Sequence, residues 1–132
     1  DPEFIVQRIA RWPLWLNVMV EVAGVQTPLT IVHAGLEPGK SRLEEMSVRC
    51  LLTIRTWDGE GVILDRPSDP PWHDVVRWPG IVVFGHWAMQ GLLIKPGFVG
   101  LDTGCVYGGQ LTGWCPEENR LYQVPGWGAG AE

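Results

Sequence analysis

Three side chains that can bind metals or carry out acid–base chemistry each follow a short apolar run. His33 directly follows a run ending at Val32, His86 follows a second run after one glycine, and Asp102 follows a third. Such runs are typical of buried strands, and ligands gather just beyond strand ends in open sheets. Two imidazoles and a carboxylate suit zinc or iron. The spacing therefore indicates a mononuclear metal site, with hydrogen-bonded structural histidines as the alternative.

The other reactive side chains form no recognisable catalytic pattern. His73 lies in a Gly-, Asp- and Pro-rich stretch, and we expect it at the surface or in a loop. Cys50, Cys105 and Cys115 are odd in number and form no CxxC motif. They indicate reduced structural thiols in an intracellular, reducing compartment, the cytoplasm. The sequence holds neither a phosphate loop nor a nucleophile elbow.

Short strands and helices must position these residues. We expect a helix that begins at 5 and is ended by Pro13, and strands over 16–22 and 27–32. A second helix from 41 to about 50 or 53, a loop over 56–71 and a helical turn over 71–76 should follow. The last elements are strands over 81–84 and 98–101 and a hairpin of 107–114 with 120–124. In the first strand, alternation predicts that Leu16, Val18, Val20 and Val22 face inward. Ser41 and Glu44 form a capping box that opens the second helix. The chain is therefore of the α/β class, a mixed sheet or sandwich carrying helices.

Composition limits the possible partners. The 132 residues suffice for one compact unit. A net charge of −5 provides no basic field for bulk nucleic acid, and no apolar run approaches the roughly 18 residues of a membrane span. Residues 1–4 are what an expression vector commonly encodes, 5–124 form the folded part, and the Gly/Ala-rich stretch 125–132 is expected to be a flexible tail.

Three collinear motifs resemble a known family. They are Val32–Pro38, Val83–Ala88 and Gly100–Thr112, preceded by a similar segment over 11–16. Together they resemble the calcineurin-like metallophosphoesterases, in the phosphoprotein-phosphatase-related branch that includes symmetrical diadenosine tetraphosphatases and ApaH-like phosphatases. The resemblance covers 5–124 and implies part of a four-layer α/β/β/α sandwich, its C-terminal half.

The resemblance implies specific roles. Such enzymes hold two divalent metals (Mn, Co, Fe, Zn or Mg) and attack phosphorus with a metal-bound hydroxide. His33 and His86 match two histidines that ligate the second metal. Asp102 matches no ligand and is expected to bond backbone. Arg55 matches an arginine that grips substrate phosphate, with a surface arginine at a helix end as the alternative.

The family's upstream motifs are absent, because the sequence has no Gly-Asp and no Asn-His dipeptide. The first metal's ligands, the bridging aspartate and the catalytic histidine are therefore not in this chain. We expect the C-terminal lobe of a phosphohydrolase, inactive alone, whose partner is the missing N-terminal half or a second copy. The expected substrate is diadenosine tetraphosphate, with a nucleotide cap or a phosphoprotein as alternatives. A phosphatase-derived binding or regulatory module without catalysis is the rival interpretation.

Overall fold

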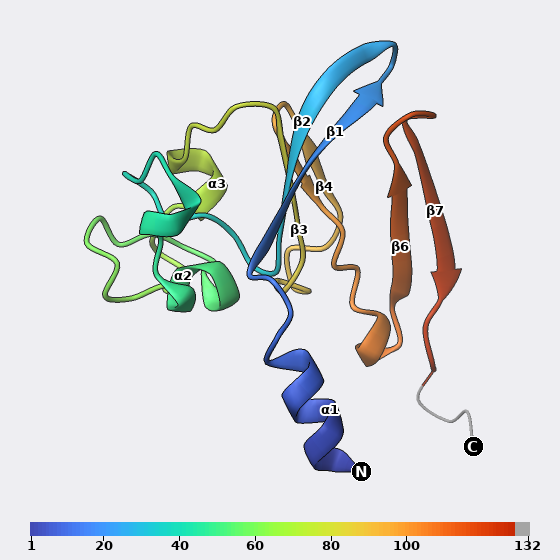
Figure 1. Cartoon of the computed structure of the whole chain (residues 1–132), viewed down its shortest axis with the longest axis horizontal. Helices are drawn as coiled ribbons and strands as arrows, with labels where there is room; N and C mark the ends of the chain where they lie inside the picture. Colours follow the sequence, from blue (N-terminus) through green and yellow to red (C-terminus); the bar gives the residue numbers. More distant parts are fainter. Residues whose placement is uncertain (129–132) are drawn as a thin grey trace.

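The computed structural model describes residues 1–128, and within them the strands form one five-stranded mixed sheet and a separate hairpin (Figure 1). The sheet order is β1-β2-β3-β5-β4. Its strands are β1 (Trp15–Val22), β2 (Val25–Val32), β3 (Ile81–Phe84), β4 (Leu93–Lys95) and β5 (Phe98–Gly100). The three central strands β2, β3 and β5 run parallel, and the two edge strands are antiparallel to their neighbours. The α/β class with a mixed sheet is as predicted, whereas β4 was not foreseen.

The β1–β2 hairpin turns at Ala23 and Gly24, both with positive φ, at 48° and 82°. Two-residue turns with positive φ at both positions match the twist of the flanking strands. Pairing therefore resumes at Val25, two residues before the predicted start of the second strand.

Two short helices, α2 (Val48–Thr53) and α3 (Trp72–Val75), lie on one side of the sheet in Figure 1. The predicted capping box at Ser41 is wrong. Only a 3₁₀ turn forms over Leu43–Glu45, Met46 is extended, and α2 begins after Ser47, whose hydroxyl accepts the N–H of Cys50 at 3.1 Å. The helical turn predicted over 71–76 is confirmed as α3.

The core lies between these helices and the sheet. Its fully buried large side chains are Trp72, Leu36, Leu51, Ile54 and Val82. The Trp72 indole packs edge-on against Phe84 and Phe98, with ring centroids 5.0 and 5.5 Å away. A Cβ on Gly35 would meet the indole at 2.4 Å, so the indole leaves room only for glycine, two residues after His33.

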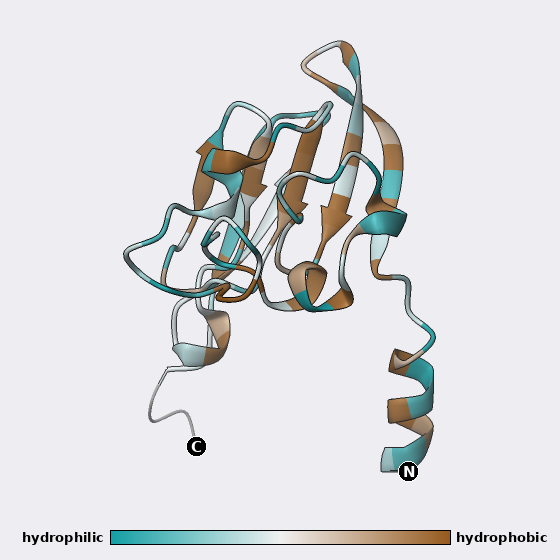
Figure 2. Ribbon diagram, turned by 90° about the vertical axis from the view of Figure 1, so that its left-hand side faces the viewer, coloured by the Kyte–Doolittle hydropathy of each residue, from teal (hydrophilic) through white to brown (hydrophobic). Residues whose placement is uncertain are grey.

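The opposite face of the sheet is also apolar. A row of aligned side chains crosses all five strands: Leu16, Ile31, Val83, Val99 and Ile94. Hydrophobic colouring runs along the strands in Figure 2. Leu16 and Ile94 at the two edges are 50% and 58% exposed, so the inward placement predicted for Leu16 is wrong; Val18 is likewise exposed. This row of five side chains is called the open face below.

A hairpin of β6 (Gln110–Cys115) and β7 (Arg120–Pro125) lies on that side of the sheet (Figure 1). The second arm agrees with the prediction to within one residue. The first arm begins at Gln110 and not at Tyr107, which lies in a 3₁₀ turn over Cys105–Tyr107. A cavity of about 320 Å³, lined by residues of β2, β3 and β6, separates hairpin and sheet. The hairpin therefore covers only part of the open face.

The first helix differs from its predicted bounds. Helix α1 (Pro2–Ile9) includes residues assigned to a vector, ends well before Pro13 and buries none of its side chains. It projects away from the sheet in Figure 2. At the other end, the Gly126 N–H bonds the Gly109 carbonyl at 2.7 Å; the rest of the predicted tail, 129–132, lies outside the described residues. Within 1–128, no helix has the length and apolar character that a membrane crossing requires.

Candidate metal and phosphate site

His33 and His86 come together beyond the carboxyl ends of β2 and β3. These strands pair in parallel, and the Gly85 N–H extends the ladder to the His33 carbonyl at 2.9 Å. The two imidazole centroids are 5.1 Å apart, with the rings tilted by 54°. His33 is exposed and His86 half-buried. The predicted meeting of these histidines at one edge of the sheet is confirmed.

The backbone of His86 is left-handed, with φ of 71°. Non-glycine residues seldom adopt this region, although histidine does so more often than most, and such positions cluster at functional sites. The turn is held by the Trp87 N–H, which donates to the Gly85 carbonyl at 2.9 Å. The sharp reversal directly after β3 thus fixes where the His86 side chain leaves the sheet.

The pKa of His86 is lowered, first by burial and then by the neighbouring His33 and Arg55. Each of these disfavours a positive charge on the ring. The Thr53 carbonyl and the Asp102 carboxylate act in the opposite direction. A neutral imidazole is the form that binds a metal, so the surroundings favour the ligating form of His86.

Arg55 follows α2 and is held through its backbone from two sides. Its N–H donates to Leu64 at 2.7 Å, and its carbonyl accepts the Trp72 N–H at 3.1 Å. Its Nε is buried and has no hydrogen-bond partner among the described residues. Because an unmatched buried donor costs free energy, an oxygen acceptor brought to this Nε would stabilise the site. It lines a cavity of about 450 Å³ together with His86.

Asp102 lies beyond the end of β5, but its carboxylate accepts the Gly104 N–H at 3.1 Å. That contact is the backbone bond that the family resemblance implies. Within 1–128, no group of three or more His, Cys, Asp or Glu side chains is placed to hold a metal. The mononuclear site of His33, His86 and Asp102 is therefore wrong. Two imidazoles offer suitable metal-binding nitrogens but are too few by themselves to complete a metal's coordination shell.

The sequence prediction for His73 was wrong. Its side chain is 5% exposed, and its Nε2 lies 2.9 Å from Gln90 Oε1. Its ring centroid is 5.8 Å from that of Phe84. Burial lowers its pKa. His73 thus links α3 to the loop that follows His86. The neighbouring Trp72, an aromatic residue in a predicted helical turn, was the one signal for burial.

Comparison with curated proteins finds relatives that share one name. The protein from Ralstonia nicotianae, named bis(5'-nucleosyl)-tetraphosphatase, symmetrical, is 51% identical over 118 residues, which are 81% of this chain and 40% of that protein. The protein of the same name from Paraburkholderia phymatum is 32% identical over 124 residues, 81% of this chain and 41% of that protein. The protein of the same name from Janthinobacterium sp. gives a shorter match, 68% identical over 43 residues, which are 33% of this chain and 16% of that protein.

Among solved structures, a crystal structure described as that of "a putative diadenosine tetraphosphatase" has a TM-score of 0.64 and 35% identity. The match covers 75% of this chain and 47% of that one. No protein-family profile matches the chain. The chain thus spans less than half the length of the relatives that it matches over most of its own length.

Proposed function

We propose that this chain, which is homologous to the C-terminal part of the symmetrical bis(5'-nucleosyl)-tetraphosphatases and shares their calcineurin-like fold, contributes one lobe of a metal-dependent phosphohydrolase. The proposed substrate of the whole enzyme is a dinucleoside polyphosphate, diadenosine tetraphosphate. The observation that carries the proposal is the pair of imidazoles beyond β2 and β3, with the unmatched Arg55 donor on the same cavity as His86.

In this proposal His33 and His86 are two ligands of a divalent metal. Bound divalent cations in such a site supply a nucleophile at neutral pH and neutralise charge on phosphoryl oxygens. Each histidine leaves its strand at a fixed point, since the ladder continues through His33 and the left-handed turn holds His86. A rigid sheet edge is the kind of support that accurate ligand placement requires.

Arg55 has a separate role, which is to bind a phosphate oxygen of the substrate. A guanidinium offers several N–H donors in a fixed plane and can bind phosphate through two parallel hydrogen bonds, in bidentate geometry. Its backbone is fixed by bonds to Leu64 and Trp72. Arg55 would therefore orient the phosphate chain without contributing a proton to the reaction.

The chain supplies only part of the catalytic centre. Within 1–128 no metal-holding group of three ligands is present, and the relatives are more than twice as long as the part matched here. The open face is an apolar surface over which the remaining part of the parent enzyme would pack. We therefore expect the isolated chain to hydrolyse no diadenosine tetraphosphate with Mn²⁺ or Co²⁺.

A chimera tests the proposal. The aligned segment of the Ralstonia nicotianae relative is replaced by this chain, and hydrolysis of diadenosine tetraphosphate is measured against Mn²⁺ concentration. We expect activity in the chimera. His33→Ala and His86→Ala should each lower kcat on the order of a hundredfold or more and raise the Mn²⁺ needed, because a ligand is lost.

Gln26→Ala, at an exposed position of β2, is the control and should leave activity unchanged. An active chimera in which both histidine variants keep full activity and metal dependence would refute the assignment. Turnover by the isolated chain that disappears in His86→Ala would show instead that the chain is catalytically complete.

A further inference from the structure

The cavity beside Arg55 and His86 extends well beyond the residues assigned to metal and phosphate. It has a volume of about 450 Å³, within the range of small-molecule sites. Three separate segments line it: Arg55 after α2, the loop 86–89 after β3, and residues of the segment 103–109 before β6. Its size and position leave space for more of a ligand than a phosphate group.

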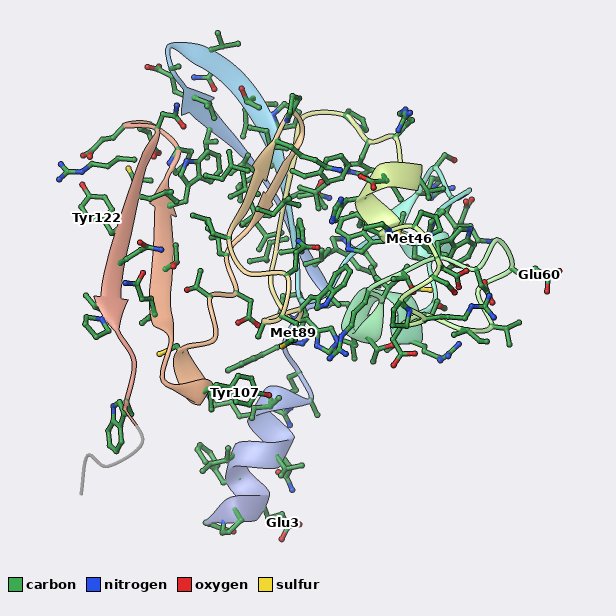
Figure 3. The ribbon with its side chains drawn as sticks, turned by 180° about the vertical axis from the view of Figure 1, so that it is seen from behind. Glu3, Met46, Glu60, Met89, Tyr107 and Tyr122 are labelled. Atoms are coloured by element: carbon green, nitrogen blue, oxygen red, sulfur yellow. The ribbon has the colours of Figure 1, made fainter. Side chains whose placement is uncertain are left out.

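The lining of this cavity includes side chains that are unusual for an exposed surface. Met89 is 92% exposed and Tyr107 is 82% exposed, and both line the cavity together with Trp87. They come from different loops and lie next to each other in Figure 3. Neither contributes to the core of the described chain. A flat aromatic ring beside a polarisable thioether is a suitable surface for stacking a heteroaromatic base.

The backbone beneath Tyr107 is held in place. Its N–H donates to the Gly104 carbonyl at 2.9 Å, and the Gly108 N–H donates to Cys105 at 3.1 Å. Gly109 approaches the Thr103 carbonyl so closely that a Cβ there would lie 2.2 Å from it. The turn is therefore formed before a ligand arrives, which reduces the entropy cost of binding.

The loop that carries Met89 is fixed as well. The Gln90 N–H donates to the Trp87 carbonyl at 3.0 Å, and the Gln90 side chain bonds the buried His73 at 2.9 Å. The lining of the cavity thus combines two kinds of chemistry, since Arg55 is cationic whereas Met89 and Tyr107 are apolar and aromatic. That combination matches a molecule that carries both an anionic chain and a flat base.

We propose that this cavity is a nucleoside subsite, in which Tyr107 and Met89 stack the base of an adenine nucleotide while Arg55 holds its adjoining phosphate. The inference rests on the proposed function and adds to it the residues that recognise the nucleoside. It also assigns a role to the two most exposed residues of the cavity, whose exposure packing does not explain.

The test measures binding to the 132-residue chain by amide chemical-shift titration, with diadenosine tetraphosphate, adenosine and inorganic tripolyphosphate as separate probes. We expect Tyr107→Ala to weaken diadenosine tetraphosphate binding roughly 5- to 150-fold, the effect of losing one stacked base. Tripolyphosphate binding should not change. Tyr107→Phe should retain nucleotide binding, because the ring remains. Met89→Ala should give a smaller loss.

Tyr122→Ala is the matched control, since Tyr122 is an exposed tyrosine on β7 that does not line the cavity and lies apart from Met89 and Tyr107 in Figure 3. Unchanged dinucleotide binding in Tyr107→Ala, or equal loss of tripolyphosphate, would overturn the subsite. Adenosine that shifts no amide at 87–89 or 107 would overturn it too. Arg55→Ala should weaken both phosphate-bearing probes. If it leaves tripolyphosphate unaffected, the phosphate role of Arg55 fails, and a Tyr107 effect would still support the subsite.

Discussion

At His86, the backbone conformation fixes where the imidazole lies, and the surrounding groups lower its pKa. The left-handed φ of 71° places the ring directly after β3, and burial, followed by the neighbouring His33 and Arg55, lowers its pKa. A histidine in a regular conformation would continue the strand direction. The residue that could be recognised as a candidate ligand from its spacing is thus also one of three non-glycine residues with a positive φ in the described part of the chain.

Asp58 gives a prediction at the residue scale. Its carboxylate accepts the backbone N–H groups of residues 60–63, which lowers its pKa to about 2. A lowered native pKa adds stability above the unfolded value near 4, and this is lost as pH falls toward 2. We expect Asp58→Asn to lower the urea midpoint at pH 7 and to flatten its decline between pH 4 and 2.

Glu60→Gln is the control, because Glu60 is exposed and only its backbone N–H takes part in this network. Its urea midpoint should follow that of the unsubstituted chain at every pH. An Asp58→Asn chain with an unchanged acid profile would show that these four hydrogen bonds do not set the stability of the loop.

At the scale of elements, the start of helix α2 shows which of two candidate N-cap serines is used. Ser41 with Glu44 matches the capping-box pattern, yet Ser47 is the residue whose hydroxyl caps a helix. The Glu37 carboxylate accepts the Ser47 N–H at 2.6 Å, which holds the helix start from a residue ten positions earlier. A local pattern could not show this, since the contact that decides between the two serines is not local.

Two serine substitutions test this assignment. Ser47→Ala should lower the free energy of unfolding by about 1 kcal/mol, the usual effect of removing an N-cap hydroxyl. Ser41→Ala should change it by only a few tenths, since Ser41 is exposed outside any helix. Urea denaturation followed by circular dichroism measures both. A larger loss of stability in Ser41→Ala than in Ser47→Ala would show that Ser47 is not the residue that caps the helix.

For the molecule as a whole, the open face governs behaviour in solution. One side of the sheet packs under α2 and α3, while the row from Leu16 to Ile94 is only partly covered by the β6–β7 hairpin. Exposed contiguous apolar surface favours association. The unpaired edges of β1 and β4, at the two ends of the sheet order, add a second route to association through strand pairing.

We therefore expect the isolated chain to self-associate. Ile94→Lys, at a site 58% exposed on the open face, should weaken association roughly tenfold or more, because each copy loses the burial of an isoleucine side chain. Val62→Lys, in the loop 56–71 and 64% exposed, is the control and should have no effect. Sedimentation velocity over a range of concentrations measures the equilibrium between the monomer and the associated form. A chain that stays monomeric at high concentration would contradict the prediction.

The sequence by itself determined the strands that precede His33 and His86, because apolar runs followed by polar residues are local signals. Spacing also indicated the β6–β7 hairpin and the turn of α3. It could not place β4, a three-residue edge strand at Leu93–Lys95 whose pairing depends on a neighbour. Nor could it show that His73 is buried, since that burial comes from Trp72, Phe84 and Phe98 around it.

The tertiary structure alone decided which chemical groups share a site. Asp102, like His33 and His86, lies just beyond the end of its strand, yet it bonds the backbone of Gly104 and is not grouped with them as a metal ligand. Tyr107 and Met89, unremarkable in sequence, line one cavity with Arg55. The physical reason is that hydrophobic periodicity and helix capping are properties of residues close together in the sequence. A site depends instead on the register and turns of segments far apart in the chain.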